Sequence, residues 1–261
     1  MQQHLEGRGR KLRLRALFCQ CAGIVRFRSS ILSIIMKTLA IIPAYNEEGS
    51  LAATIDELKR LAPEVDYLIV NDGSRDGTRA LCIEHGFNFL DLPVNVGLSA
   101  GFQAGMKYAV SHDYDCAVQF DADGQHRPEF LASMVEHMEQ NGDDVVIGSR
   151  FVGRKKNVSA RMAGSSLIKG MIRLTTGAQI LDPTSGMRLY GRKAMAFFAQ
   201  EDFFGPEPDT IAYLIRHGYK VAEVPVEMRD RTTGESYLSF TKSIKYMLSV
   251  CTSILFAQWF R

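Results

Sequence analysis

From Thr38 to Val226, short apolar runs alternate along the chain with segments whose apolar residues recur at helical spacing. The runs predict strands at Thr38–Pro43, Asp66–Val70, Phe87–Leu90, Cys116–Phe120, Val145–Gly148 and Lys220–Val226. The segments between and after them predict helices at Leu51–Leu61, Thr78–His85, Ala100–Ser111, Glu129–Gln140, Arg161–Thr175 and Asp209–Arg216. Strands that alternate with helices favour crossover connections, so this order predicts an α/β fold with a mostly parallel central sheet flanked by helices.

Polar side chains gather where three of the predicted strands end. Ala44–Glu48 follows the first strand, Asn71–Ser74 the second and Asp121–His126 the fourth. A sheet of this kind binds its ligand beyond the carboxyl ends of its strands. These clusters therefore predict a single ligand-binding crevice.

Asp121 and Asp123 are two carboxylates one residue apart at a strand end. Such a pair suits Mg²⁺ or Mn²⁺, which would also bind a substrate diphosphate and neutralise the charge on a departing nucleoside diphosphate. Taken alone, the same residues also fit a solvated turn. Asp72 is predicted to accept hydrogen bonds from a base or ribose, although a helix cap at Ser74 or Asp76 explains that cluster too.

Several classes of protein are excluded or disfavoured. After the first strand the chain has neither a Gly-x-Gly-x-x-Gly run nor a Gly-Lys-Ser/Thr phosphate loop, which argues against dehydrogenases and P-loop enzymes. Its five cysteines form no Cys-x-x-Cys pair, so we expect free thiols in a reducing compartment and no structural zinc. A hydrophobic content of 46% with 23% charged residues excludes collagenous, disordered and polytopic membrane classes.

Six motifs occur in a fixed order along the chain. They are Ile-Pro-Ala-Tyr-Asn-Glu-Glu, Val-Asn-Asp-Gly-Ser-x-Asp-Gly-Thr, Asn-x-Gly, Asp-Ala-Asp-Gly-Gln-His, Gly-Ser-Arg and Asp-x-x-Ser-Gly-x-Arg. In this order and spacing the chain resembles the inverting family-2 glycosyltransferases of the GT-A fold, particularly the dolichyl- or polyprenyl-phosphate sugar transferase branch. The resemblance covers about Thr38 to Phe240.

This resemblance implies a metal-dependent hexosyltransferase that uses a nucleotide-sugar donor, preferably a UDP-sugar, and Mg²⁺ or Mn²⁺. The residues implied for the nucleoside are Pro43, Ala44, Tyr45, Glu47 and Asp72. Asp121 and Asp123 would serve the metal and the diphosphate, and Gln125 would complete the metal shell. Arg150 is implied near phosphate, while Asp182, Ser185 and Gly186 would shape the sugar pocket.

A later segment resembles the element that this branch places against an acceptor phosphate. It carries Arg229, Arg231, Gly234 and Ser236. Arg231 offers a planar fork for phosphate oxygens, and Gly234 permits close approach of the backbone. Without the resemblance, a charged exposed turn explains these residues equally well.

The chain departs from its relatives in two ways. Many relatives carry a lysine after Asn-x-Gly, where this chain has Leu98 and Ser99. A lysine contact to the donor phosphate is therefore not expected. The multi-span membrane domain common at the carboxyl end of relatives is also missing, so a terminal helix or a small membrane protein would have to supply membrane attachment.

The class of acceptor decides whether the enzyme needs a general base. A polyprenyl phosphate is largely ionised near neutrality, because the second pKa of a phosphate monoester is about 6. A saccharide hydroxyl, as in cell-wall or surface polysaccharide synthesis, would need a carboxylate such as Glu207 or Asp209, both of which also fit the start of a helix. A third hypothesis is a donor-binding subunit that is active only with a small membrane partner.

We expect three parts: a basic extension at 1–36, a GT-A catalytic domain at 37–228, and an acceptor-phosphate loop with an amphipathic helix at 229–261. The extension carries seven Lys and Arg against one Glu, and fits either a membrane-surface segment or a translation start placed upstream of Met36. The uncharged run Tyr246–Phe260 is too short to span a membrane dependably, and fits an interfacial or partner-binding helix or one that packs on its own domain. We therefore expect a peripheral protein at the cytoplasmic face of a membrane, without nucleic-acid partners and with homo-oligomerisation left open.

Overall fold

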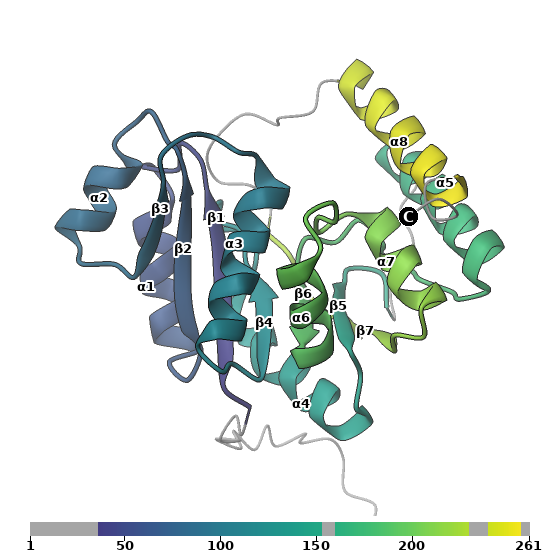
Figure 1. Cartoon of the computed structure of the whole chain (residues 1–261), viewed down its shortest axis with the longest axis horizontal. Helices are drawn as coiled ribbons and strands as arrows, with labels where there is room; N and C mark the ends of the chain where they lie inside the picture. The colour runs from purple at the N-terminus through teal and green to yellow at the C-terminus, as the bar shows by residue number, and fades with distance from the viewer. Residues whose placement is uncertain (1–35, 153–159, 230–239, 257–261) are drawn as a thin grey trace, which may run out of the picture. The chain divides into compact units, whose positions relative to one another are not determined.

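Four neighbouring parallel strands form one half of the sheet, and the predicted polar loops follow three of them. The computed structural model describes residues 36–152, 160–229 and 240–256. Their seven-stranded sheet has the order β3-β2-β1-β4-β6-β5-β7 (Figure 1). The strands are β1 Thr38–Ala44, β2 Asp66–Asp72, β3 Phe89–Leu92, β4 Cys116–Gln119, β5 Val145–Ser149, β6 Arg188–Gly191 and β7 Val221–Pro225. Strand β6 runs antiparallel to both β4 and β5, and β7 runs parallel to β5.

Helices cover both faces of the sheet. They are α1 Leu51–Leu61, α2 Thr78–Glu84, α3 Leu98–Ser111, α4 Leu131–Asn141, α5 Ala160–Thr176, α6 Arg192–Gln200, α7 Pro208–Arg216 and α8 Phe240–Leu255, with a 3₁₀ turn η1 at Pro128–Phe130. Helices α1, α2 and α4 share one hydrophobic cluster, and α3, α5, α6, α7 and α8 share the other. This arrangement confirms the predicted α/β fold with a mostly parallel sheet flanked by helices.

Strand β1 shows why both clusters form on a single sheet. Successive side chains of a strand point to opposite faces, so Leu39 and Ile41 join the cluster of α3 while Ala40 and Ile42 join that of α1. All four side chains are completely buried. Full burial of each leucine or isoleucine contributes about 1.5 to 3 kcal/mol, which makes β1 a rigid base for the loop that follows it.

Several sequence-based elements differ from the structure, among them helix α3, which begins at Leu98 rather than Ala100. The third predicted strand is shifted by two residues, since β3 begins at Phe89 rather than Phe87. The helix predicted from Glu129 begins instead as the turn η1, where Pro128 fixes the first backbone angle. Strand β6 and helix α6 were not predicted, because β6 has only four residues and runs directly into the helix.

Helix α8 packs against α5 and α7 within the same hydrophobic cluster. Its buried residues in that cluster are Val250, Cys251 and Ile254. Within the described ranges, no helix is both long and apolar enough to cross a bilayer. The predicted boundaries at residues 36 and 228 stay predictions.

Candidate active site

The loops that follow β1, β2 and β4 lie at one edge of the sheet, because these strands are neighbours in the order β2-β1-β4. The backbone amide of Asn46 donates to Ser74 Oγ at 3.0 Å, and Arg75 N donates to Asn46 Oδ1 at 2.8 Å. Thr54 Oγ1 on α1 donates to the carbonyl of Ala122 at 3.0 Å. The loops after β1 and β2 are therefore bonded to each other, and the loop after β4 is bonded to α1, the helix that follows the first loop.

The loop after β1 carries the residues predicted to hold a nucleoside. Ala44 is buried, whereas Pro43, Tyr45 and Glu47 are half-buried. Glu47 N donates to Thr78 Oγ1 at 2.8 Å, which connects this loop to the start of α2. The loop is thus held in place while parts of Tyr45 and Glu47 still reach solvent.

Asp72 ends β2 and is only 5% exposed. Its two carboxylate oxygens accept the amides of Val96 at 2.7 Å and Gly97 at 2.9 Å, which are the last residues before α3. A Cβ on Gly73, whose φ is +61°, would lie 2.5 Å from the backbone nitrogen of Asn95, so only glycine permits this approach. The carboxylate predicted to bind the nucleoside is therefore fixed by two amides and keeps lone pairs for further donors.

The two aspartates after β4 have different surroundings. Asp123 is 5% exposed, and its Oδ1 accepts the amide of Gln125 at 3.0 Å. The side chain of Asp121 is 35% exposed and lies beside the buried ring of His126, whose Nδ1 accepts the Asp121 amide at 2.9 Å. This contact assigns the proton of a neutral imidazole to Nε2, which is 3.4 Å from Asp121 Oδ2. His126 thus accepts the Asp121 amide and lies beside its carboxylate, part of which still reaches solvent.

Gly186 brings a second loop against Asp121. A Cβ added there would lie 3.0 Å from Asp121 Oδ2 and 3.3 Å from two atoms of the His126 ring. Ser185 is buried, and its hydroxyl donates to the carbonyl of Gly148 on β5 at 2.5 Å. The structure therefore brings together the residues predicted for the metal and two of those predicted for the sugar.

Arg150 and Asp182 hold one another. The guanidinium donates to both carboxylate oxygens at 2.7 and 2.8 Å, and the Arg150 amide adds a third bond at 3.0 Å. Asp182 is fully buried, and Glu223 on β7 accepts its amide and that of Leu181. Hydrogen bonding to Asp182 raises the pKa of Arg150, which keeps the guanidinium charged. The predicted contacts of Arg150 with phosphate and of Asp182 with sugar stay predictions.

Arg188 and His126 are site residues that belong to two of the sequence motifs but had no predicted role. Arg188 is 2% exposed, and its guanidinium donates to the carbonyls of Ser185, Pro206 and Pro183 at 2.7 to 2.8 Å. It therefore ties the Gly186 loop to the loop before α7. The signal was the last residue of Asp-x-x-Ser-Gly-x-Arg, an arginine entering a run that is otherwise apolar.

The two candidate general bases lie against α8. Tyr246 donates its hydroxyl proton to the carboxylate of Glu207, and Ser253 Oγ donates to Asp209 Oδ2 at 2.5 Å. Burial, and then the negative charge of Glu207, raise the pKa of Tyr246. Glu207 is the N-cap residue of α7 and Asp209 lies in its first turn, so both carboxylates also interact favourably with the positive end of the helix dipole.

Arg229 is the described member of the predicted acceptor-phosphate group. Its guanidinium forms a bidentate ion pair with Glu57 of α1 at 2.7 and 2.9 Å. Its backbone exchanges hydrogen bonds with Gln125, one to the carbonyl and one from the side-chain amide. The other predicted members, Arg231, Gly234 and Ser236, lie outside the described residues, and the acceptor role of the group stays a prediction.

The oxygen atoms near Asp121 suit a hard divalent cation. Mg²⁺ is usually held by one or two carboxylates together with water and substrate phosphates, rather than by a full cage of protein ligands. Within the part of the chain that the structure describes, no three His, Cys, Asp or Glu side chains cluster around a metal position. Two carboxylates and the Gln125 amide, with Gly186 leaving space beside Asp121, fit an ion that shares its shell with a diphosphate.

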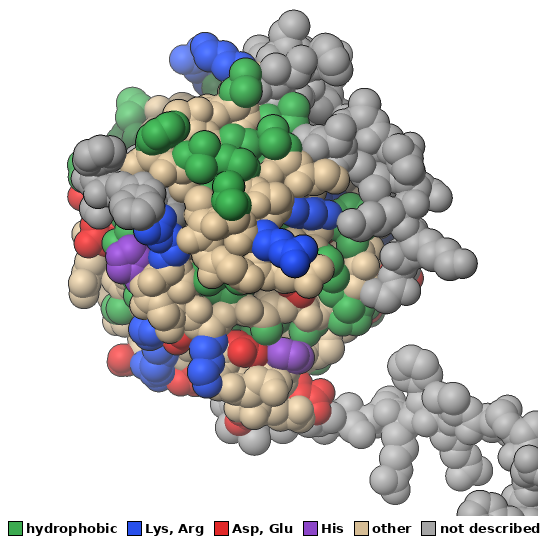
Figure 2. Space-filling model, turned by 90° about the vertical axis from the view of Figure 1, so that its right-hand side faces the viewer, with side chains coloured by type: hydrophobic (Ala, Val, Ile, Leu, Met, Phe, Trp, Pro, Cys, Tyr) green, Lys and Arg blue, Asp and Glu red, His purple; other side chains and the backbone are tan. Residues whose placement is uncertain are grey.

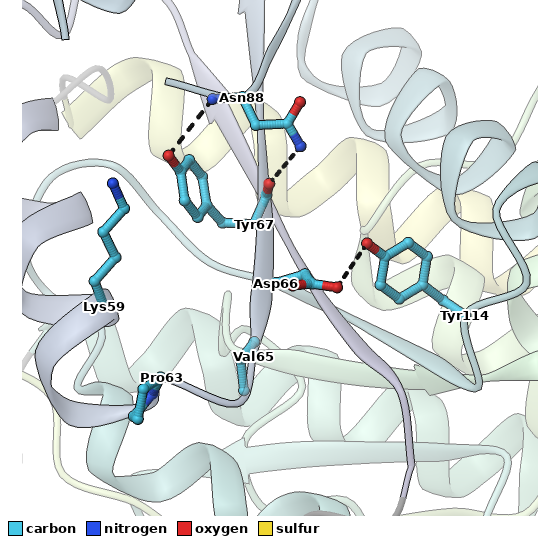
Figure 3. Close-up of a pocket in the computed structure, with 7 residues that line it drawn as sticks. All are labelled: Lys59, Pro63, Val65, Asp66, Tyr67, Asn88 and Tyr114. Atoms are coloured by element: carbon cyan, nitrogen blue, oxygen red, sulfur yellow. Dashed lines mark hydrogen bonds between the residues drawn. The ribbon is translucent and has the colours of Figure 1, made fainter. Parts of the chain in front are cut away.

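A cavity of about 370 Å³ lies at the opposite end of β2 (Figure 3). Its lining comprises Lys59, Pro63, Val65, Asp66, Tyr67, Asn88 and Tyr114. In it, the Tyr114 hydroxyl donates to Asp66 at 2.9 Å, and the Asn88 amide donates to the carbonyl of Tyr67. Asp66 begins β2 and Asp72 ends it, so about 20 Å separates this cavity from the candidate site. None of the predicted site residues lines the cavity.

Comparisons with known proteins agree with this geometry. The sequence model of glycosyl transferase family 2 matches residues 39–197. Polyprenol monophosphomannose synthase of Mycolicibacterium smegmatis is 31% identical over 85% of this chain and 86% of its own length. Undecaprenyl-phosphate mannosyltransferase of Micrococcus luteus is 32% identical over 86% of this chain and 96% of its own length.

Solved structures share the fold at lower identity. A mannosyltransferase from Pyrobaculum calidifontis, in complex with GDP-Man and Mn²⁺, superposes with a TM-score of 0.59 at 15% identity, covering 85% of this chain and 64% of that one. Glucosyl-3-phosphoglycerate synthase from Mycobacterium tuberculosis, with Mg²⁺ and uridine diphosphate, gives 0.57 at 20% identity over 84% and 79% of the two chains. At these identities the structures establish the GT-A fold alone.

Proposed function

The chain belongs to glycosyl transferase family 2, in the polyprenyl-phosphate sugar transferase branch, and on that premise we propose that it transfers a sugar from a nucleotide-sugar donor to a polyprenyl- or dolichyl-phosphate-type lipid with inversion. In this reaction an acceptor phosphate oxygen forms a bond to the anomeric carbon. The bond from that carbon to the nucleoside diphosphate breaks on the opposite face of the sugar. The chain's residues then have three tasks: to hold the donor, to hold the acceptor phosphate and to align the two.

The donor half of the proposal uses the edge formed by β1, β2 and β4. Pro43, Ala44, Tyr45, Glu47 and Asp72 would contact the nucleoside. Asp121, Asp123 and Gln125 would hold Mg²⁺ or Mn²⁺, which when bound neutralises charge on the leaving diphosphate. Gly186 and Ser185 would lie beside the sugar, because their loop already contacts Asp121.

Two further residues keep these groups aligned. His126 restrains Asp121 through its ring nitrogens, and Arg188 fixes the Gly186 loop through three carbonyls. Arg150, which follows β5, is bonded to Asp182 of the Gly186 loop, and its side chain is 39% exposed, so that phosphate oxygens could reach it. Fixed dipoles and charges of this kind are effective because they need not reorganise during the reaction.

The structural observation that carries the acceptor class is the engagement of Glu207 and Asp209 by hydroxyl groups of α8. A saccharide hydroxyl would require one of these carboxylates to accept its proton during the reaction. An ionised lipid phosphate needs no such base, so with this acceptor Glu207 and Asp209 can serve to hold α8 in place. Transfer to a saccharide hydroxyl therefore ranks second.

We further propose that the outer face of α5 and α8 lies on the membrane that contains the acceptor. Four large apolar side chains on or directly beside these helices are at least 49% exposed: Leu167, Leu174, Leu248 and Phe256. Neither helix contains an Asp or Glu, whereas both carry Lys or Arg. Figure 2 shows hydrophobic side chains gathered on this side of the molecule, with basic side chains among and below them. Apolar and basic groups together suit an anionic lipid surface, and we assign it to the cytoplasmic leaflet.

Vesicle co-sedimentation tests this surface. Leu174→Asp should reduce binding to vesicles with anionic lipid at least fivefold, while the exposed control Ile83→Asp on α2, on the other side of the sheet, should leave it unchanged. Equal binding of both variants and the unaltered protein would show that another surface is used.

An acceptor assay tests the function itself. Purified protein, Mn²⁺ and a panel of UDP- and GDP-sugars are incubated with either a short-chain polyprenyl phosphate or a saccharide. Product on the lipid alone supports the proposal, and product on the saccharide alone rejects it. The uridine preference implied by the family resemblance enters this panel as a prediction, and the mannosyl relatives add GDP-mannose. A chain that turns over only after a small membrane protein is added would instead be a donor-binding subunit.

A further inference from the structure

We propose that Glu57, on helix α1, is a positioning residue for the donor site, which it organises by holding Arg229 and, through it, Gln125. The proposal rests on the function proposed above, since it assumes that Gln125 faces a metal-bound diphosphate. It also gives Arg229 a different task from the acceptor contact that the sequence suggested.

The first contact is the ion pair between Glu57 and Arg229. Both terminal nitrogens of the guanidinium reach the carboxylate, Nη1 to Oε2 at 2.7 Å and Nη2 to Oε1 at 2.9 Å. The side chains are 21% and 39% exposed, so water competes only partly with this pair. A parallel, bidentate arrangement fixes direction as well as distance. An Arg229 held in this way would have to release Glu57 before it could grip a phosphate with the same fork.

The second contact connects Arg229 to the aspartate loop. Arg229 N donates to the carbonyl of Gln125 at 3.0 Å, and Gln125 Nε2 donates to the carbonyl of Arg229 at 3.3 Å. Because Gln125 Nε2 is the donor in this contact, Gln125 Oε1 is the side-chain atom that can accept a hydrogen bond or bind a cation. Gln125 N in turn donates to Asp123 Oδ1 at 3.0 Å. A continuous path of contacts therefore leads from Glu57 to Asp123.

Helix α1 holds the same loop at a second point, one turn earlier. Thr54 Oγ1 donates to the carbonyl of Ala122, between the two aspartates, and residues three apart share one face of a helix. The buried face of α1 next to Thr54 is fixed by Ile55 and Leu58, which are completely buried. Helix α1 thus sets the distance between the aspartate turn and the segment after β7 that carries Arg229.

Neighbouring charges support this arrangement. Arg127 bridges Glu129 at 2.9 Å and Glu227 at 3.0 Å, and Glu129 lies 4.0 Å from Arg229. Two arginines and three glutamates therefore join α1, η1 and the segment after β7. Of these contacts, the pair of Glu57 with Arg229 is the one that is both bidentate and continuous with Gln125.

A double-mutant cycle read out by metal binding tests the proposal. Electron paramagnetic resonance of free Mn²⁺ gives the dissociation constant of the intact protein with Mn²⁺ alone and with GDP or UDP added. We expect Glu57→Gln and Arg229→Gln each to raise the dissociation constant of Mn²⁺ measured with nucleotide about tenfold, as loss of support around the metal ligands typically does. The double variant should bind Mn²⁺ no more weakly than the single variant with the lower affinity. In the charge-swapped pair, Glu57→Arg with Arg229→Glu, the dissociation constant should return to within about threefold of that of the unaltered protein.

A matched control removes the other neighbour of Glu57. Arg60 lies 3.8 Å from the same carboxylate on the exposed side of α1, and Arg60→Gln should leave Mn²⁺ binding unchanged. Should Glu57→Gln fail to fold, the charge-swapped pair, which keeps both charges, carries the test.

The outcomes separate this inference from the proposed function. If the unaltered protein shows no nucleotide-dependent Mn²⁺ site, the proposed function fails together with the inference. If that site is intact in Glu57→Gln while Arg229→Gln raises only the KM for polyprenyl phosphate, Arg229 serves the acceptor and Glu57 positions nothing. Additive effects without recovery in the swapped pair would equally overturn the proposal.

Discussion

Replacing Gly186 with alanine should damage donor binding while leaving the fold almost intact. The new Cβ would lie 3.0 Å from Asp121 Oδ2 and 3.3 Å from the His126 ring. Relaxing the first contact to an ordinary separation requires a displacement of about 0.4 Å. Because the atom that must move is the end of a side chain rather than backbone, we expect a stability loss below about 1 kcal/mol.

The same displacement matters more for chemistry. A misplacement of about 1 Å in an active site costs about a hundredfold in rate, so a shift of about 0.4 Å corresponds to a five- to tenfold loss in kcat/KM, or about 1.0 to 1.4 kcal/mol. The assay is steady-state transfer of sugar to a polyprenyl phosphate, with thermal unfolding of the same samples. Gly170→Ala is the control, because nothing lies within 4 Å of its added Cβ. Unchanged kcat/KM in Gly186→Ala would refute the placement of this loop beside the donor.

Three further variants test the supports of the site. Arg188→Met leaves three buried carbonyls without their donor and should lower the free energy of unfolding by about 3 kcal/mol or more in chemical denaturation. The control Arg192→Met removes an exposed ion pair with Asp115 and should change this free energy by less than about 1 kcal/mol. Gly73→Ala places a Cβ 2.5 Å from Asn95 N and should lower the free energy of unfolding by at least about 2 kcal/mol. Gly142 also has a positive φ but open space around its added Cβ, so Gly142→Ala should lower it by about 1 kcal/mol. Asp91→Asn should cost about 0.5 kcal/mol at pH 7, because a hydrogen bond from Arg79 lowers the pKa of Asp91. That stabilisation is present above the unfolded pKa of about 3.9 and is lost as the pH falls through the lower folded pKa. The denaturation curves of variant and parent should therefore converge once the pH lies below the folded pKa. A difference in the free energy of unfolding that stayed constant with pH would contradict a lowered pKa of Asp91 in the folded protein.

Local patterns were sufficient to predict most of the parallel part of the sheet. Strands β1, β2 and β4 are short apolar runs followed by polar turns, and the side chains of β1 from Leu39 to Ile42 are buried on the alternating faces that a strand period assigns. Strand β6 could not be found in this way. Its four residues include the buried Arg188, whose charge is satisfied by carbonyls of the loop directly before β6 and of the loop before α7. That burial depends on tertiary contacts, which no local pattern encodes.

The candidate site was predictable in its carboxylates but not in what holds them. Asp72, Asp121 and Asp123 stand at strand ends, where topology alone indicates a ligand. The partners of Arg150 and Arg229 come from residues 32 and 172 positions away in sequence, so a solitary arginine in a motif gives no sign of whether it faces a substrate or a carboxylate. The roles of His126 and Glu57 likewise depend on distances that only the folded chain provides.

Calorimetric titration of the donor tests most directly whether a divalent ion joins Asp121 and Asp123 to the diphosphate. GDP-mannose and UDP-glucose are titrated into the unaltered protein and into the double variant Asp121→Asn, Asp123→Asn, each with Mn²⁺ or with EDTA. We predict that one of the two donors binds the unaltered protein with Mn²⁺, and that EDTA or the double substitution weakens this binding at least a hundredfold, or about 2.7 kcal/mol. A folded double variant that binds the donor as tightly as its parent, or donor binding that ignores EDTA, would contradict the account.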